Sequence, residues 1–270
     1  MHKSDMAAGT WIKMRDGVKF NKPILIVGLP GVGNVGKIVV THIKTELRAK
    51  RFATLYSNHF LHRVIMMKNG KLRMMSNRFY YVKAKKKGGK DIVLLTGDDQ
   101  AVTPEGQYEV NLAIVDFFKN ELGGSFVFTV GGYAPAEPIA STPQVFGNAS
   151  DKEVIKTFKG AKVVFGKTKG VIWGSAGLIV ALAKQRGIPG ICLMGETAIM
   201  DMDAAAAKSV LSLLGNVLNL QLNTQGLDDI INKTTKALKE LEQQMSMGIF
   251  QQPQNIQNPS TPEQGPSYIR

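Results

Sequence analysis

Residues 24–40 read ILIVGLPGVGNVGKIVV, and this stretch decides the fold. Four apolar residues at 24–27 follow Pro23 and precede a cluster of glycines, a pattern typical of a short buried strand. From Val35 onward, apolar residues recur at offsets of 3, 4, 8 and 12, which predicts the buried face of a helix. With a further apolar run at 54–57, the chain begins as strand, helix and strand. This order indicates an α/β protein with helices on the faces of a sheet.

The same patterns extend along the chain. An Asn69-Gly70 pair between two apolar runs predicts a hairpin with a type I′ turn. Residues 131–149 are expected to form a long loop, and a helix starting near Leu227 carries one narrow apolar seam. We expect a flexible lead-in over 1–21, one α/β domain with its C-terminal helices over 22–245, and a disordered tail over 246–270.

Composition restricts the class of protein. The chain has 270 residues, of which 44% are hydrophobic and 20% charged, so it can bury a core of its own. Its single cysteine, Cys192, excludes an intramolecular disulfide and a four-thiolate zinc site. No apolar run reaches about 18 residues, and no apolar leader opens the chain. A cytoplasmic protein without a membrane partner is therefore expected.

The net charge of +13 is unevenly placed. Residues 1–100 hold 20 Lys and Arg against 6 Asp and Glu, whereas residues 101–270 hold 14 against 15. The densest run, Lys83 to Lys90, contains only lysine, alanine and glycine, which is typical of a solvated hairpin tip. Because no RNA- or DNA-binding motif accompanies this charge, a nucleic-acid partner is not expected.

The glycine cluster matches two nucleotide-binding patterns incompletely. Gly31, Gly33 and Gly36 spell GxGxxG, but no acidic residue follows the second strand about 20 positions later. The same stretch spells GxxxxGK, but Ile38 stands where a P-loop needs a hydroxyl for Mg²⁺. We therefore interpret the glycines as residues that let the helix pack closely on the sheet. Binding of a small anion by a turn of Gly31, Gly33, Asn34 and Lys37 is left open.

Other candidates for catalysis are weaker. Ser175 lies in a segment that only loosely resembles a nucleophile elbow, because Trp173 occupies the place of the first glycine. The four histidines lack an evident triad acid or further metal ligands, and Cys192 lies within an apolar run. The sequence thus predicts no catalytic residue, no metal site and no cofactor.

Five segments in order resemble the proteasome-assembly-chaperone family, in its archaeal and bacterial form. They are GLPGVGNVGK at 28–37, LLTGDDQ at 94–100, GGYA at 131–134, GSAGLIVALAKQRGIPGICLMGET at 174–197, and the helical region that follows. The resemblance implies a three-layer α/β/α sandwich with a mixed central sheet, like the nucleoside-phosphorylase fold. The family is sometimes catalogued as ATP-grasp-like, a label that the residues of this chain do not support.

The resemblance also implies a function. Members form rings or smaller homo-oligomers, and some archaeal members bind the core proteasome through a C-terminal motif of a hydrophobic residue, tyrosine, any residue and a free carboxylate. Here Tyr268 occupies the hydrophobic place, Ile269 stands where tyrosine is expected, and Arg270 is last. We expect a non-enzymatic chaperone or activator homologue that docks on the core proteasome ring by this tail, as a homo-oligomer. The alternative is an enzyme that binds a small phosphorylated or nucleotide-like ligand at the turn 28–37.

Overall fold

The computed structural model describes residues 9–15, 17–86, 88–135, 142–167, 170–198, 202–229 and 231–232. The chain divides into one unit from Met1 to Asp228 and another from Asp229 to Arg270. All the strands and labelled helices belong to the first unit, and the described residues of the second are helical. Most of the helix predicted from Leu227, and the whole of the predicted tail, lie outside the described residues.

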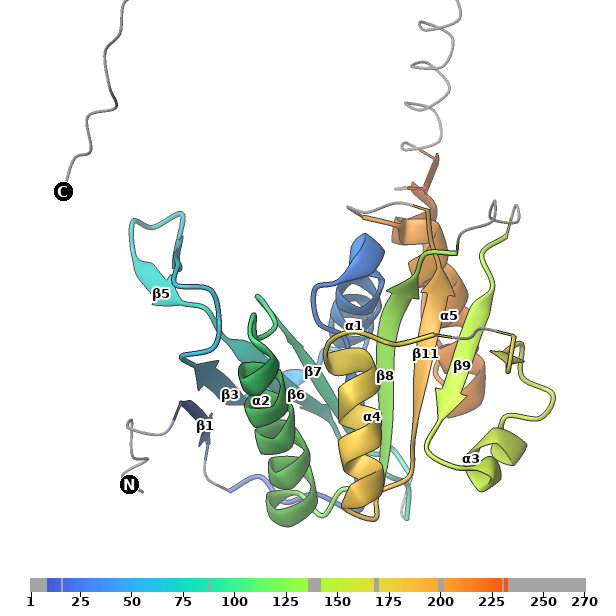
Figure 1. The fold of residues 1–270 in the computed structure, drawn as a ribbon, viewed down its shortest axis with the longest axis horizontal. Coiled ribbons are helices and arrows are strands. Elements are labelled where there is room, and N and C mark those ends of the chain that lie inside the picture. The colour runs from blue at the N-terminus through green and yellow to red at the C-terminus, as the bar shows by residue number, and fades with distance from the viewer. Residues whose placement is uncertain are drawn as a thin grey trace, which may run out of the picture. The chain divides into compact units, whose positions relative to one another are not determined.

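The first unit is built on a nine-stranded mixed sheet in the order β1-β3-β6-β7-β2-β8-β11-β9-β10 (Figure 1). The strands are β1 (Thr10–Met14), β2 (Ile24–Val27), β3 (Lys50–Ser57), β6 (Asn77–Val82), β7 (Ile92–Gly97), β8 (Phe126–Tyr133), β9 (Val145–Ala149), β10 (Val164–Phe165) and β11 (Gly190–Glu196). The four central strands, β7, β2, β8 and β11, are parallel. Antiparallel pairs occur on both flanks, so the predicted mixed sheet is confirmed.

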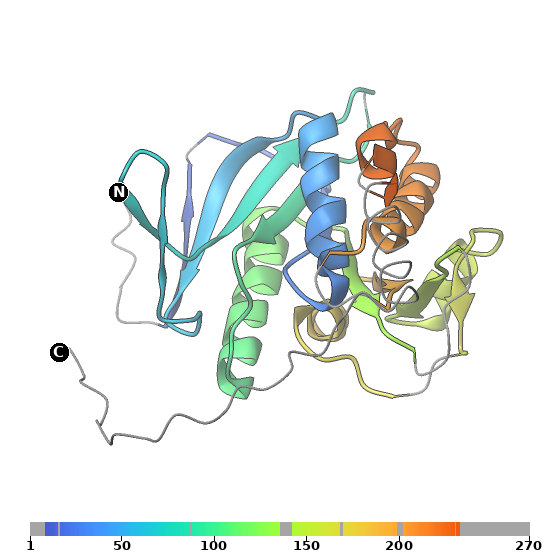
Figure 2. The same ribbon diagram turned by 90° about the horizontal axis from the view of Figure 1, so that it is seen from above.

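Helices cover both faces of this sheet. They are α1 (Val35–Glu46), α2 (Pro104–Asp116, continued by a π-helical turn, Phe117–Glu121), α3 (Lys152–Thr157), α4 (Ser175–Gln185) and α5 (Ala204–Leu218). Figures 1 and 2 show α2 and α4 packed together on one face, and α1 and α5 packed together on the other. The predicted three-layer α/β/α sandwich is therefore confirmed.

Sequence features explain where these helices begin and what they bury. The hydroxyl of Thr103 caps α2 by accepting a hydrogen bond from the backbone N–H of Gly106 at 3.1 Å. Ile114 and Phe118 of this helix then join Leu25 and Leu95 in the core beside the sheet. Alternate side chains of a strand point to opposite faces, and all four residues of β2 are buried because helices cover both of its faces.

Two predictions of irregular structure are wrong. Residues 10–14, expected within a flexible lead-in, form the edge strand β1, whose Trp11 stacks on Tyr56 of β3 with ring centroids 5.7 Å apart. Residues 145–149, expected in a loop, form β9, which pairs with β11. Both are short strands near the ends of the sheet, and pairing with neighbouring strands offsets their weak local pattern: β1 pairs with β3, and β9 pairs with β11 and β10.

The hairpin between β3 and β6 is confirmed, but its predicted turn type is wrong. β4 (Val64–Met66) and β5 (Leu72–Met74) form a separate two-stranded sheet. A type I′ turn needs positive φ at two residues, but Gly70 (φ 74°) has a positive φ and Asn69 does not. The N–H of Gly70 instead donates to the carbonyl of Met67 at 2.9 Å.

In the described part of the chain, every helix is too short or too polar to cross a bilayer.

Candidate functional site

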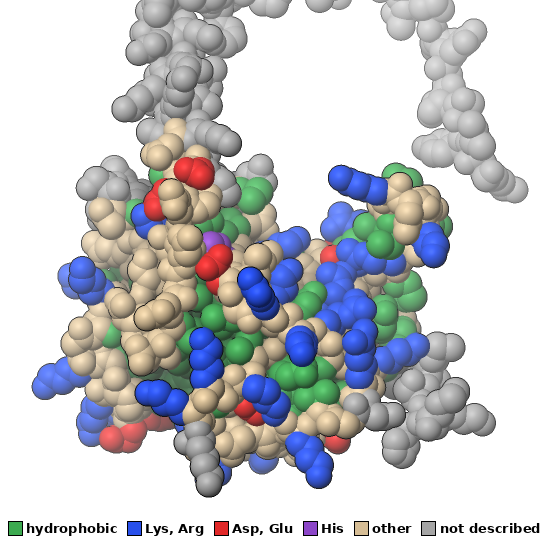
Figure 3. Space-filling model, turned by 180° about the vertical axis from the view of Figure 1, so that it is seen from behind, with side chains coloured by type: hydrophobic (Ala, Val, Ile, Leu, Met, Phe, Trp, Pro, Cys, Tyr) green, Lys and Arg blue, Asp and Glu red, His purple; other side chains and the backbone are tan. Residues whose placement is uncertain are grey.

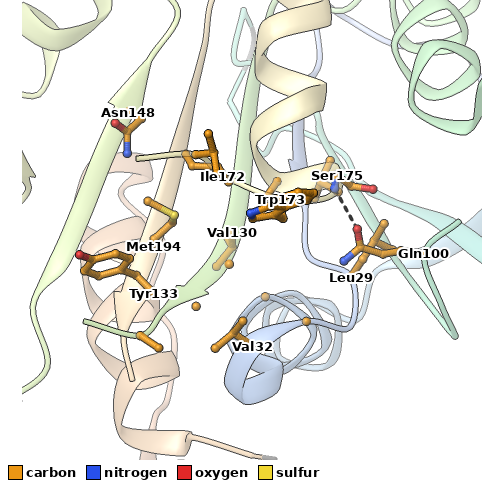
Figure 4. A pocket seen from close by; sticks show the side chains of 18 of the residues that line it. Leu29, Val32, Gln100, Val130, Tyr133, Asn148, Ile172, Trp173, Ser175 and Met194 are labelled. Carbon is orange, nitrogen blue, oxygen red and sulfur yellow. Dashed lines mark hydrogen bonds between the residues drawn. The ribbon is translucent and has the colours of Figure 1, made fainter. Parts of the chain in front are cut away.

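A pocket of about 430 Å³ opens at the carboxyl ends of β2, β8 and β11. The turn after β2 forms one side, and the segment 170–175 that enters α4 forms another. Figure 4 shows Ile172, Trp173 and Ser175 along that segment, with Val130 of β8 between them and Val32. Ligand sites of α/β proteins commonly occupy this edge of a parallel sheet. The pocket is therefore the candidate site for a small molecule.

One glutamine joins two walls of the pocket. The side-chain N–H of Gln100 donates to the carbonyl of Pro30 at 2.6 Å, in the turn after β2. Its side-chain oxygen accepts the backbone N–H of Ser175 at 2.8 Å, at the start of α4 (Figure 4). Because one side chain satisfies both backbone groups, the two walls are held at a fixed separation.

Glycines let backbone segments approach one another at the base of the pocket. A Cβ atom on Gly36 would lie 2.3 Å from the carbonyl oxygen of Val130, and one on Gly132 would lie 2.3 Å from that of Val32. Real Cβ atoms do not approach oxygen so closely, so glycine is required at both places. The packing interpretation of the glycine cluster is confirmed for Gly36.

The predicted ligand turn is only partly at the pocket. Gly31 lines it, whereas Gly33, Asn34 and Lys37 are not among its lining residues. Gly33 is buried with φ 59°, and Asn34 has φ 49°, so the chain passes through the left-handed region before α1 begins. The backbone N–H of Asp203 donates to the carbonyl of Gly33 at 2.9 Å, which ties the turn to the start of α5. These contacts give the turn a structural role.

The described walls of the pocket carry no charge. Among the described residues, no Lys, Arg, Asp, Glu or His lines it. Its apolar side chains include Leu29, Val130, Ile172 and Met194, and its polar ones are Gln100, Ser175, Asn148 and Tyr133. A general acid or base with a shifted pKa, which marks many active sites, is absent from these walls.

The surroundings of Cys192 and His59 do not favour a catalytic role for either residue. Burial raises the pKa of the Cys192 thiol to about 11, so the reactive thiolate is scarce at neutral pH. His59 pairs with Glu109 at 2.9 Å. No cluster of three His, Cys, Asp or Glu that could hold a metal occurs in the part of the chain that the structure describes.

A basic surface surrounds the β4–β5 hairpin. Residues 47–90 contain 13 Lys and Arg and no acidic residue. Figure 3 shows cationic side chains gathered on the side that carries the hairpin, with apolar side chains among them. The exposed apolar residues of the hairpin are Val64, Met66, Met67, Leu72 and Met74. Clustered exposed apolar residues are typical of surfaces that contact other proteins.

Asp98 anchors this hairpin to the sheet. Its carboxylate accepts hydrogen bonds from Arg73 at 3.0 Å, from Arg78 at 2.7 Å and from the backbone N–H of Ser76 at 3.1 Å. Burial acts to raise the pKa of Asp98, but the hydrogen bond from Arg73 and the charge of Arg78 outweigh it and hold that pKa below its usual value.

Several residues of the pocket were not predicted from the sequence as site residues. Trp173 entered only as a mismatch to a serine motif, and Asn148 was assigned to a loop. A signal for the pocket rim was present in Gly170-Val171-Ile172-Trp173-Gly174, an apolar triplet between two glycines. The predicted docking residues Tyr268, Ile269 and Arg270 lie outside the described residues.

Comparison with known proteins supplies relatives over most of the chain. Residues 25–244 match the model of the PAC2 family. An uncharacterised protein of Methanocaldococcus jannaschii is 32% identical over 236 residues, which are 85% of this chain and 89% of that protein. Among solved structures, PbaB of Pyrococcus furiosus, an archaeal proteasome activator, is 36% identical. That likeness has a TM-score of 0.82 and covers 87% of this chain and 99% of PbaB.

A second solved structure shares the fold at lower identity. PbaA of Pyrococcus furiosus, an archaeal homologue of proteasome-assembly chaperone, is 22% identical, with a TM-score of 0.72 over 89% of this chain and 94% of PbaA. The family match spans all the central strands and the glycine cluster from which the pocket is built. The protein described here therefore belongs to the PAC2 family.

Proposed function

We propose that this chain is a non-enzymatic, proteasome-associated chaperone or activator homologue that acts as a homo-oligomer and docks on the core proteasome by its C-terminal tail. The observation that carries the proposal is the 36% identity to PbaB of Pyrococcus furiosus, a proteasome activator, over 99% of that chain. The uncharged pocket supports a non-enzymatic role, because its described walls offer no carboxylate, histidine or cysteine for proton transfer.

The proposed mechanism is multivalent. Each copy contributes one tail that ends in Tyr268, Ile269 and the carboxylate of Arg270. The two apolar side chains would enter a groove of the core particle, and the carboxylate would meet a lysine there. Tails that are joined through one oligomer have a high effective concentration, so weak individual contacts suffice for stable docking.

The test is capture of purified core proteasome from the organism that encodes this chain. Full-length protein is compared with a variant that lacks residues 268–270 and with a matched control in which residues 258–260 are replaced by alanine. We expect the full chain and the control to capture the core particle and to stimulate peptide hydrolysis. The truncated protein should do neither, although its melting temperature should be unchanged.

Two results would contradict the proposal. Undiminished capture by the truncated chain would place the interface on the folded unit and refute docking by the tail. Failure of the full-length chain to capture or stimulate the core particle would refute the proteasome-associated role.

A further inference from the structure

We propose that the pocket at the carboxyl ends of β2, β8 and β11 binds an uncharged, mainly apolar small molecule that carries a hydrogen-bonding group. This activity would be additional to the proposed docking by the tail, and it depends only on described residues of the first unit. The volume, about 430 Å³, lies in the range of pockets that hold small organic ligands.

The walls exclude a charged ligand. The described lining residues carry no cation that could pair with a phosphate or carboxylate, and Lys37 of the glycine turn is not among them. An anion in this pocket would lose its hydration without gaining a partner, which is costly. A cation would be equally costly to bury, since no carboxylate is among the described lining residues. The site therefore selects neutral molecules.

Two free polar groups define one end of the pocket. The carboxamide of Asn148 and the hydroxyl of Tyr133 have no hydrogen-bond partner among the described residues, whereas both ends of the Gln100 side chain are occupied. Figure 4 shows Asn148, Met194 and Tyr133 at the end of the pocket opposite Gln100. A ligand would place its hydrogen-bonding group near Asn148 and Tyr133, and its apolar part against Met194, Val130 and Ile172.

The rim of the pocket offers additional apolar surface. Val171 is 77% exposed and Trp173 is 88% exposed, although both line the opening. The rim segment is bounded by Gly170 (φ 145°) and Gly174 (φ 80°), which hold backbone conformations that favour glycine. A ligand in the pocket would cover part of this apolar surface, which adds to the free energy of binding.

Two fluorescent probes test the predicted preference for neutral ligands. N-phenylnaphthylamine is uncharged and apolar, and anilinonaphthalenesulfonate has the same ring system with an added sulfonate. The protein has a net charge of +13, so non-specific attraction favours the sulfonate. We expect saturable binding of about one neutral probe per full-length chain, at least about tenfold tighter than binding of the sulfonate.

A pocket-filling variant tests the location. A Cβ atom on Gly131 would meet nothing closer than the Cβ of Ala176 at 3.4 Å, so position 131 has room for a Cβ beside the pocket. Gly131→Val adds methyl groups there, and valine is favoured in strands. It should weaken binding of the neutral probe by about tenfold or more. The control is Met66→Ser, which removes an 84%-exposed apolar side chain from the hairpin and should leave binding unchanged.

A second variant keeps the proposal testable if Gly131→Val does not fold. Asn148→Ala removes one free polar group, the carboxamide to which the N–H of the neutral probe can donate. It should weaken binding of the neutral probe by about fivefold. Melting temperatures show which variants are folded. Sulfonate binding as tight as neutral binding, or unchanged neutral binding in folded Gly131→Val or Asn148→Ala protein, would overturn the proposal. So would loss of binding in Met66→Ser, since that would place the probe on the hairpin.

Discussion

Gly28 and Gly36 lie so close together across the strand-to-helix turn that a Cβ atom on Gly28 would stand 2.0 Å from the carbonyl oxygen of Gly36. The same atom would lie 2.6 Å from a methyl group of Val40. The turn therefore brings α1 onto the sheet at a distance that only glycine permits, and several parts of the pocket depend on that approach.

We expect Gly28→Ala to lower the free energy of unfolding by about 3 kcal/mol, because the added methyl group must push α1 away from the sheet. Gly31→Ala is the matched control. Gly31 has extended backbone (φ −179°), and its nearest neighbour to an added Cβ would be 3.7 Å away. Urea denaturation of both variants measures the difference, and equal stabilities would contradict the packing role of Gly28.

Asp98→Asn should destabilise the protein by about 2 kcal/mol at neutral pH, because two arginines lose their buried carboxylate. The pKa of Asp98 is lower in the folded state than in the unfolded chain, so its contribution is present above the unfolded pKa. The contribution is lost as the pH falls through the lower, folded pKa. The stability difference between the two proteins should therefore shrink below about pH 4.

Asp99→Asn provides the neighbouring control for that experiment. Asp99 pairs with Arg63, whose side chain is largely exposed, and exposed pairs contribute little. We expect a change below about 1 kcal/mol at neutral pH. If Asp98→Asn and Asp99→Asn were equally stable at every pH, the anchoring role of Asp98 would be wrong.

Calorimetry should detect no binding of ATP with Mg²⁺ or of NAD at physiological concentrations. Ile38 cannot ligate Mg²⁺, and no acidic residue lies at the end of β3 to bind a ribose. The described walls of the pocket add a physical reason, since they offer no cation for a phosphate. A micromolar dissociation constant for either nucleotide would favour the alternative function, an enzyme with a nucleotide-like ligand at the turn 28–37.

Light scattering of the full-length protein at micromolar concentration should report a multiple of 29.4 kDa. The apolar hairpin residues are exposed in one chain, which is costly in water unless another surface covers them. Removal of residues 268–270 should not change the mass, because the proposed assembly depends on other surfaces. A mass of one chain at this concentration would refute the homo-oligomer.

Strong local patterns made much of the fold predictable from the sequence. The run 24–27 and the periodicity after Val35 each depend on neighbours within a few residues, and each predicted the observed element. β1 and β9 were missed because their stability comes from partners far along the chain: Trp11 pairs with Tyr56, and Val145 with Gly195. The strand propensity of a short segment does not depend on such distant partners, so it cannot predict the pairing.

The pocket was less predictable, for the same physical reason. Its lining comes from six separated parts of the sequence, which meet only when β2, β8 and β11 are aligned. The glycine turn was noticed because its residues are consecutive. Asn148 and Trp173 were not, because an isolated asparagine or tryptophan becomes part of a site only through the residues that the fold places opposite it.

The position of β2 between β7 and β8 has a consequence during synthesis. The four buried residues at 24–27 leave the ribosome well before either neighbour, since β7 starts at Ile92 and β8 at Phe126. At about 5–20 residues per second, roughly 100 residues of translation separate β2 from its second partner, an interval of about 5–20 s. Throughout that time an apolar segment with unpaired backbone groups is open to aggregation. We therefore expect that a general chaperone must bind the nascent chain until β8 has emerged.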